Sequence, residues 1–191
     1  MAMQGSIHLV LGPMFSGKTD EIIRQHVRQT LRLSNGGCLV FKYAGDTRYS
    51  KDEKVLVSLS GASVKATPIS SLEEGDALVQ STRSRHIIID EGQFYGDLVK
   101  YCTFWADSCG CRVVVSALDG DAKKKPWESV SALMPHCDTI VKLSAICNEC
   151  GADAPFSSRK KSDNTERVQI GSTDKYEALC RHCYKVENDI E

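Results

Sequence analysis

The sequence lacks any long apolar run and any excess of positive charge. No stretch of the 191 residues approaches the roughly 20 apolar residues that cross a bilayer. The first residues, MAMQGSIHLV, do not form a charged leader followed by a long apolar segment. A formal net charge of -1 argues against a protein whose main task is to bind nucleic acid through its phosphates. We therefore expect a cytoplasmic protein with neither a membrane nor a nucleic-acid partner.

A glycine-rich segment is present at residues 12–19, which read GPMFSGKT. In the pattern G-x-x-x-x-G-K-[ST], backbone N–H groups and the lysine bind nucleotide phosphates, and the last hydroxyl binds Mg²⁺. The apolar run 6–11 precedes the segment and predicts a strand, and residues 19–33 predict an amphipathic helix with Ile22, Ile23, Val27 and Leu31 on one face. This order disfavours the alternative of a glycine turn that binds nothing. The expected triphosphate-binding residues are Gly12, Pro13, Met14, Phe15, Ser16, Gly17, Lys18 and Thr19.

A second phosphate-site element follows three isoleucines at 87–89, which are typical of a buried parallel strand. Asp90 and Glu91 come directly after them, at the strand end where open α/β sheets bind ligands. We expect Asp90 to hold Mg²⁺ together with Thr19. Glu91 should face the other way along the pleat, where it would orient water in an ATPase or accept a proton from a hydroxyl in a small-molecule kinase. The alternative is that Asp90 and Glu91 are ordinary solvated carboxylates on the surface.

The remaining pattern predicts an α/β fold. Apolar runs at 38–42, 111–117 and 139–143 predict further strands, and residues 96–108 and 125–133 predict helices. Such alternation favours a parallel sheet with helices on both faces. Residues 46–68 are polar and lack a clean period, so a loop is expected there.

Nine cysteines are many for this length, but their number is odd and a nucleotide site implies a reducing compartment. Disulfides are therefore not expected. Five cysteines lie in or beside apolar stretches and should be core residues or incidental thiols: Cys38, Cys102, Cys109, Cys111 and Cys137.

The other four cysteines form two C-x-x-C pairs, Cys147 with Cys150 and Cys180 with Cys183. Two such pairs predict a tetrahedral zinc site with four thiolate ligands and no open position, so the metal would be structural. His182 is a competing ligand, although its spacing fits less well. We expect a phosphate-loop domain at residues 1–143 and a small zinc-binding domain at 144–191.

The zinc-binding part is not expected to bind nucleic acid, because acidic residues outnumber basic ones between 143 and 191. Its basic cluster, Arg159 to Lys161, would be a solvated loop or a phosphate-facing patch.

Several segments in one order resemble the type II, cellular-type thymidine kinases. They are GPMFSGKT, KYAGDTRYS (42–50), IDEGQFY (89–95), SALDGDAKKKPW (116–127), CNEC and GSTDKYEALCRHC (171–183). The resemblance implies phosphoryl transfer from ATP with magnesium to the 5′-hydroxyl of thymidine. It implies a RecA-like domain with a zinc-anchored lasso that closes over the nucleoside. It also implies a homotetramer and feedback inhibition by dTTP.

The resemblance gives roles to residues that the spacing alone left open. Glu91 would be the general base, Lys18 and Arg48 would act on the transferring phosphoryl group, and Asp46 and Gln93 would lie on the nucleotide side. From the residues alone, a surface ion pair between Asp46 and Arg48 is an equally good interpretation. The implied nucleoside pocket comprises Met14, Phe94, Leu118, Ala122, Trp127, Arg167, Val168, Gln169, Ile170, Gly171 and Tyr176. Plain core packing is the alternative for Leu118 and Trp127.

Three residues depart from the family pattern. Ala122 stands where an aromatic residue is usual, Trp127 replaces another aromatic, and Ser157 stands where threonine is frequent. A reshaped pocket would admit deoxyuridine or bulky analogues.

Two other functions compete with the kinase. One is a P-loop ATPase whose zinc module acts on a macromolecular partner, and the other is a non-catalytic nucleotide-binding scaffold. The second fits poorly with an intact set of Lys18, Thr19, Asp90 and Glu91.

Overall fold

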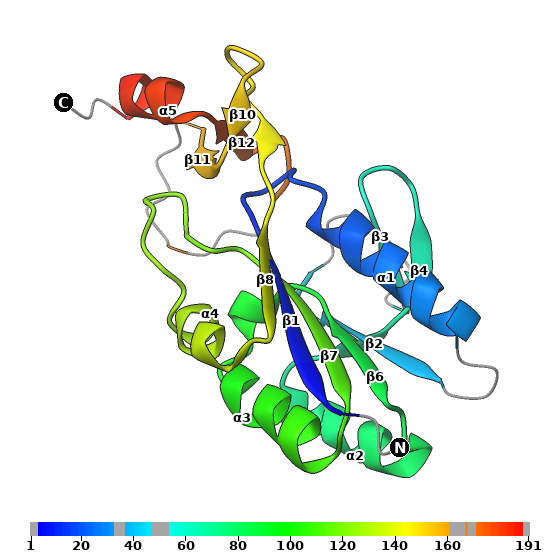
Figure 1. Ribbon diagram of the computed structural model, residues 1–191. Helices are drawn as coiled ribbons and strands as arrows, with labels where there is room; N and C mark the ends of the chain where they lie inside the picture. The colour runs from blue at the N-terminus through cyan, green and yellow to red at the C-terminus, as the bar shows by residue number, and fades with distance from the viewer. Residues whose placement is uncertain (1–3, 33–36, 47–53, 161–166, 168–170, 189–191) are drawn as a thin grey trace.

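A six-stranded parallel sheet forms the centre of the computed structural model, which describes residues 4–32, 37–46, 54–160, 167 and 171–188. Its strands run in the order β5-β2-β6-β7-β1-β8, and every neighbouring pair is parallel. The bounds are β1 (Ser6–Leu11), β2 (Cys38–Tyr43), β5 (Thr67–Ile69), β6 (His86–Ile89), β7 (Arg112–Ala117) and β8 (Thr139–Lys142). The predicted α/β fold with a parallel sheet is confirmed (Figure 1).

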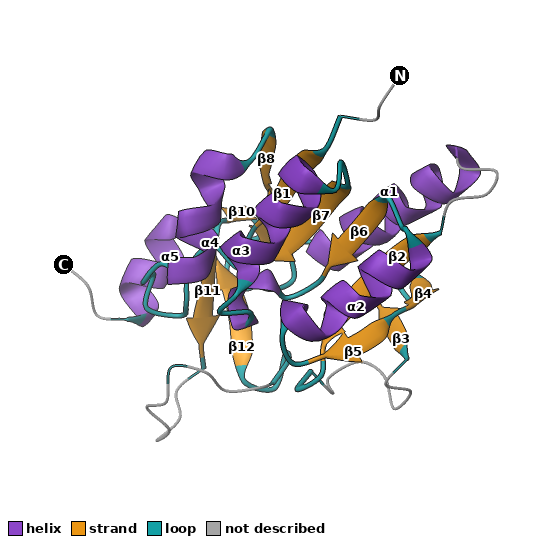
Figure 2. Ribbon diagram, turned by 90° about the horizontal axis from the view of Figure 1, so that it is seen from below, coloured by secondary structure: helices purple, strands orange, loops and turns teal. Residues whose placement is uncertain are grey.

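Helices cover both faces of this sheet (Figures 1 and 2). Successive strand residues point to opposite sides, so both faces carry apolar side chains that the helices bury. On one face, Val10, Val40 and Ile88 pack against Ile22 and Ile23 of α1 (Lys18–Arg32). On the other, neighbours such as Leu9, Phe41 and Ile89 pack against three further helices. These are α2 (Leu72–Thr82), α3 (Leu98–Thr103), which continues into a π-helical turn η2 (Phe104–Ser108), and α4 (Glu128–Leu133).

The short elements connect this core. They are the hairpin β3 (Val55–Val57) and β4 (Ser63–Lys65), and the 3₁₀ turns η1 (Gly92–Phe94) and η3 (Met134–His136). The expected loop at 46–68 is therefore corrected for its described part, which contains β3, β4 and part of β5. Each of these strands has only three residues, which is too short to show a period.

Two helix predictions also need correction. The single helix expected at 96–108 changes at Phe104 from α-helical to π-helical hydrogen bonding. The amphipathic face of α1 is buried only at Ile22 and Ile23, whereas Val27 and Leu31 are 50% and 82% exposed. The sheet thus covers the start of α1, which carries the phosphate loop, and leaves those two side chains in solvent.

Residues after β8 form a smaller unit with its own buried cluster. Two antiparallel pairs, β9 (Ala145–Ile146) with β10 (Asp153–Ala154) and β11 (Phe156–Arg159) with β12 (Tyr176–Leu179), precede helix α5 (Arg181–Glu187). Figure 1 shows this unit beside the loop that leads into α1. Its cluster contains mostly small side chains together with Leu179 and Tyr184. The boundary at residue 143/144 between two domains stays a prediction.

Across all described residues, no helix is both long enough and apolar enough to span a membrane.

Candidate active site

The phosphate loop connects the end of β1 to the start of α1. Gly17 has φ +80°, a conformation that glycine adopts without strain. A Cβ on Gly12 would lie 2.6 Å from Ser16 Oγ and 2.8 Å from the Leu143 carbonyl oxygen. Lys18 Nζ donates a 2.7 Å hydrogen bond to the Pro13 carbonyl oxygen, within the loop itself. The predicted strand, loop and helix are therefore arranged as a phosphate-binding loop requires.

A cavity of about 490 Å³ lies over this loop. Its lining includes the consecutive residues Met14 to Asp20, and the hairpin β3–β4 adds Val57 and Leu59. The side chain of Ser60 donates a hydrogen bond to Asp20, which fixes the hairpin beside the first turn of α1. The hairpin residues and Asp20 were not expected at this cavity, because their sequence has no phosphate-binding pattern.

The carboxylates after β6 lie at the carboxyl end of the sheet. Asp90 is 4% exposed and accepts a hydrogen bond from Ser116 at the end of β7, the strand between β6 and β1. Glu91 is not in an extended strand, because β6 ends at Ile89 and Glu91 has φ 54° and ψ 45°. The expected pleat alternation between Asp90 and Glu91 is thus wrong, and a left-handed turn sets the direction of the Glu91 side chain.

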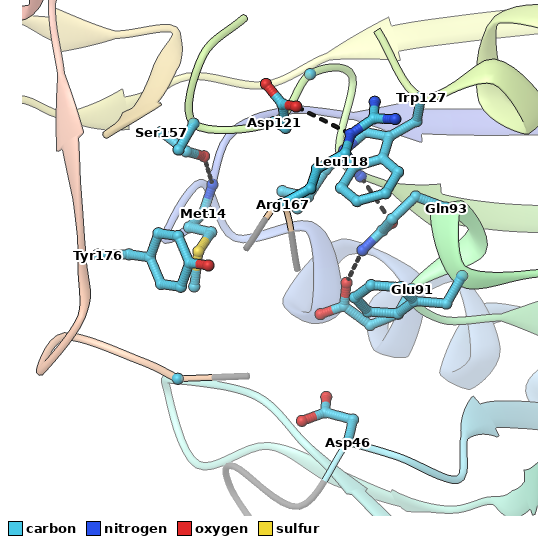
Figure 3. Close-up of a pocket in the computed structure, with 14 residues that line it drawn as sticks. Met14, Asp46, Glu91, Gln93, Leu118, Asp121, Trp127, Ser157, Arg167 and Tyr176 are labelled. Atoms are coloured by element: carbon cyan, nitrogen blue, oxygen red, sulfur yellow. Dashed lines mark hydrogen bonds and ion pairs between the residues drawn. The ribbon is translucent and has the colours of Figure 1, made fainter. Parts of the chain in front are cut away.

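Gln93 holds Glu91 in place from the turn that follows. Its side-chain nitrogen donates to Glu91 Oε2, and its oxygen accepts a 3.0 Å hydrogen bond from the Leu118 backbone N–H (Figure 3). Gln93 is 5% exposed, so this bridge is shielded from water. Gln93 and Asp46 were expected on the nucleotide side, but both line the second cavity described next.

That second cavity has a volume of about 550 Å³ and largely apolar walls. Its lining residues are Met14, Asp46, Glu91, Gln93, Phe94, Leu118, Gly120, Asp121, Ala122, Trp127, Ser157, Arg167, Gly171 and Tyr176. Trp127 and Phe94 meet edge to face, with ring centroids 6.0 Å apart. Trp127 also belongs to the main buried cluster, so it both packs in the core and lines the cavity.

Met14, Glu91 and Leu118 line both cavities. The Glu91 carboxylate therefore lies at the boundary between the phosphate loop and the apolar cleft. Met14 is buried at 6% exposure, and its backbone N–H donates a 2.9 Å hydrogen bond to Ser157 Oγ of β11. This bond ties the phosphate loop to the smaller unit.

Arg167 approaches the cleft from the segment between the two cysteine pairs. Its Nε lies 3.0 Å from Asp121 Oδ2, its Nη2 donates a 2.7 Å hydrogen bond to the Pro126 carbonyl, and its guanidinium carbon lies 4.5 Å from the centre of the Trp127 ring (Figure 3). The more exposed Glu128 accepts longer, 3.3 Å bonds. Asp121 and Gly120 were not singled out from the sequence, although both lie in the segment SALDGDAKKKPW.

Several expected residues are not placed in either cavity. Gly12, Pro13 and Asp90 line neither of them. Arg48, Val168, Gln169 and Ile170 lie outside the described residues.

The four cysteines of the two C-x-x-C pairs come together, as predicted. Their sulfur atoms all lie within 4.8 Å of one another, and Cys150 and Cys180 are 3.7 Å apart. Zn–S bonds of about 2.3 Å in a tetrahedron place sulfurs about 3.8 Å apart, so the donor set fits zinc. Burial opposes ionisation of Cys147, but backbone N–H groups of Cys180, Cys150 and Glu149 outweigh it and lower the pKa to about 6. Among the described residues, the competing ligand His182 is not part of the cluster.

The fold and the site define a P-loop α/β protein in which a phosphate-loop cavity adjoins an apolar cleft, with a four-cysteine cluster that fits a metal ion in the smaller unit. A family model described as thymidine kinase matches residues 5–184, and the chain therefore belongs to the thymidine kinase family. It is 40% identical to a thymidine kinase of Yaba monkey tumor virus, over 96% of this chain and 97% of the relative. It is 39% identical to human cytosolic thymidine kinase, over 95% of this chain and 74% of the relative. It is 40% identical to thymidine kinase 1 of Dictyostelium discoideum, over 97% of this chain and 80% of the relative.

Proposed function

We propose that the protein transfers the γ-phosphoryl group of ATP to the 5′-hydroxyl of thymidine and so forms dTMP for DNA synthesis by nucleotide salvage. The observation that carries this proposal is the position of Glu91 between the two cavities. A triphosphate on the phosphate loop and a nucleoside in the apolar cleft would meet beside this carboxylate. Membership of the thymidine kinase family supports the choice of acceptor.

In this scheme the residues on either side of Glu91 have different roles. Backbone N–H groups of the phosphate loop and Lys18 would bind the phosphates, and Thr19 and Asp90 would hold Mg²⁺, which would neutralise charge on the phosphates. Glu91, oriented by Gln93, accepts the proton of the 5′-hydroxyl as that oxygen attacks phosphorus. Arg48 would complete the phosphate side, whereas Asp46 lines the apolar cleft. The four cysteines would hold a zinc ion that stabilises the smaller unit and takes no part in the chemistry.

The apolar walls of the cleft suit an uncharged pyrimidine that carries a methyl group. Phe94, Leu118 and Trp127 would contact the base from the main domain. Tyr176 and the segment 167–171 would close the opposite side, where main-chain groups bind the base. Exclusion of water is needed because water beside ATP is a competing acceptor.

The variant Glu91→Gln tests the proposal. Loss of a general base should lower kcat roughly 100- to 10,000-fold, with the affinity for an ATP analogue unchanged. Glu73→Gln, which alters an exposed carboxylate on α2, is the matched control. Thymidine-dependent ADP release is the measurement, and full activity of Glu91→Gln would refute the assignment.

The same assay separates the rival function. A P-loop ATPase that acts on a macromolecule would release ADP without any nucleoside and would respond to its partner. A thermal-shift panel of nucleosides with an ATP analogue and Mg²⁺ would show which acceptor stabilises the protein.

We further propose that the cleft accepts deoxyuridine, because Ala122 and Trp127, which both depart from the family pattern, line it. Competition kinetics between thymidine and deoxyuridine test this, and strong discrimination against deoxyuridine would contradict it. Inhibition by dTTP, which would occupy both cavities at once, is proposed from the family and is measured in the same assay.

A cytoplasmic homotetramer is also proposed from the family. Two apolar surfaces support contacts between copies: Val27 and Leu31 on α1, and Ile140 and Val141 on the edge strand β8. Light scattering would give the assembly, and a monomer at micromolar concentration would contradict it.

A further inference from the structure

One wall of the apolar cleft is a tight loop between β7 and α4. This wall loop comprises residues 118–127, and five of its residues line the cleft: Leu118, Gly120, Asp121, Ala122 and Trp127. The Asp121 backbone pairs with Lys124 and Lys125, and Asp121 Oδ1 accepts 2.9 Å bonds from the N–H groups of Lys123 and Lys125. Lys124 has φ 60°, a left-handed conformation that costs free energy in a residue other than glycine. Contacts from outside the loop must therefore help to hold this shape.

Such contacts come from Tyr184 on α5. Its hydroxyl donates a 2.7 Å hydrogen bond to the Ala122 carbonyl oxygen. Lys124 Nζ lies 3.6 Å from the centre of the Tyr184 ring and 4.2 Å from that of Phe156. Tyr184 is 2% exposed, so both contacts are shielded from water.

The backbone of Tyr184 is in turn fixed by the cysteine cluster. Tyr184 directly follows Cys183, and its N–H donates a 2.9 Å hydrogen bond to the carbonyl of Cys180. Cys180 caps the start of α5, and its sulfur accepts a 3.4 Å hydrogen bond from the Cys183 N–H. Two cysteines of the cluster, Cys180 and Cys183, are therefore linked directly to Tyr184, the residue whose side chain holds the wall loop.

We propose that Tyr184 is a positioning residue for the nucleoside, through which the four-cysteine site fixes the cleft wall at Ala122. The inference rests on the proposed function, because the nucleoside is the ligand whose binding reports the wall. Within the wall loop, Leu118 alone lines the phosphate-loop cavity. Changes at Tyr184 should therefore weaken binding of the acceptor nucleoside and leave ATP binding unchanged.

Tyr184→Phe removes the hydroxyl and keeps the ring under Lys124. Loss of one hydrogen bond between neutral groups should raise the KM for thymidine roughly 3- to 10-fold. The kcat, the KM for ATP and the zinc content should stay within about twofold of the wild type, because the bond acts on binding alone. A purely structural role would instead lower kcat and the zinc content together. Tyr101→Phe, which removes a hydroxyl contacted by Lys100 on α3, is the matched control.

Hydrogen–deuterium exchange gives a readout that needs no substrate. In Tyr184→Phe, the amides of Lys123, Lys124 and Lys125 should exchange faster than in the wild type, and in Tyr101→Phe they should not. Lys124→Met, which removes the cation from the ring, should act in the same direction and serves as the second variant if Tyr184→Phe does not fold.

The kinetic and the exchange measurements separate the proposed function from the proposed role of Tyr184. If the wild type does not phosphorylate any nucleoside, the proposed function fails, and exchange alone decides the role of Tyr184. Unchanged exchange at residues 123–125 would overturn the inference. So would an equal rise in the KM values for thymidine and ATP.

Discussion

At the scale of single residues, two loops at the candidate site adopt backbone conformations that side chains other than glycine rarely take. Phe15 in the phosphate loop has φ 65°, and Glu91 after β6 has φ 54°. Such conformations cost of order 1–3 kcal/mol and persist only where the surroundings hold them. At Glu91 the holding group is Gln93, and at Phe15 the side chain packs against the buried cluster of the smaller unit. Both residues therefore depend on neighbours that a local sequence pattern does not reveal.

Arg167 should matter more for nucleoside binding than its partial exposure suggests. Its bond to the buried Asp121 is shielded, whereas the pair with Glu128 is open to solvent. Arg167→Gln should weaken thymidine binding by about 1 kcal/mol, roughly fivefold in KM. Glu128→Gln, the matched control, should change it less than twofold, as expected of an exposed pair. Steady-state kinetics at two salt concentrations provide the measurement, and equal effects of the two variants would contradict the prediction.

His8 on β1 should make stability depend on pH. Burial and the charge of Arg112 lower its pKa, Glu21 opposes them, and burial also lowers the pKa of His26. Among the described residues, none forms a hydrogen bond with His8 Nε2. The unfolded chain, with a histidine pKa near 6.5, takes up protons first, so the free energy of unfolding should fall as pH drops below about 6.5.

Urea unfolding between pH 7.5 and 5.5 checks this sign. His8→Gln should flatten the dependence, whereas His136→Gln, at an exposed site, should leave it unchanged. A steeper fall in His8→Gln than in the wild type would be the contrary result.

At the scale of elements, the strands that carry the site could be predicted, because each is a short apolar run between polar segments. β1, β2, β6, β7 and β8 all lie where such runs predicted them. Helix α2 lies outside every expected segment, and Gly75 in its first turn suggests a break. The structure gives the reason for this glycine, since a Cβ there would lie 3.0 Å from the Phe41 ring. Tertiary packing thus requires a residue that weakens the local helix signal.

Asp97 joins two of these helices and should contribute to stability. Just before α3, its carboxylate accepts hydrogen bonds from the N–H groups of Leu72 (3.2 Å) and Glu73 (3.0 Å) in the first turn of α2. Asp97→Asn removes the charge and one of the two acceptors, and should cost about 1 kcal/mol of unfolding free energy. Asp107→Asn, at an exposed site, should cost less than about 0.5 kcal/mol. Urea midpoints at pH 7 compare them, and equal midpoints would argue against a capping role.

At the scale of the whole molecule, the site combines parts that the sequence indicates to different degrees. Residues 12–19, Asp90 with Glu91, and the cysteine pairs carry their chemistry in a few consecutive positions, so the motifs alone indicated them. Asp121, Ser116 and the hairpin residue Leu59 reach the site only through packing of distant segments. No spacing rule could have identified them, because each acts through a partner that is remote in the chain.

Removal of the metal should affect the two cavities unequally. The buried cluster of the smaller unit consists mainly of alanine and cysteine side chains, which bury too little apolar surface to hold the unit without its metal. Chelation, or Cys147→Ser, should abolish phosphoryl transfer to thymidine, because Arg167, Tyr176 and the Tyr184 contact are lost from the cleft. ATP-analogue binding should survive but weaken, since Phe15 and Met14 lose their contacts with this unit.

Cys109→Ser, at a cysteine outside the cluster, is the control for loss of a thiol. Calorimetry with the analogue, far-UV circular dichroism for the six-stranded sheet and zinc content should be measured together. A zinc-free protein with full thymidine kinase activity would disprove this dependence.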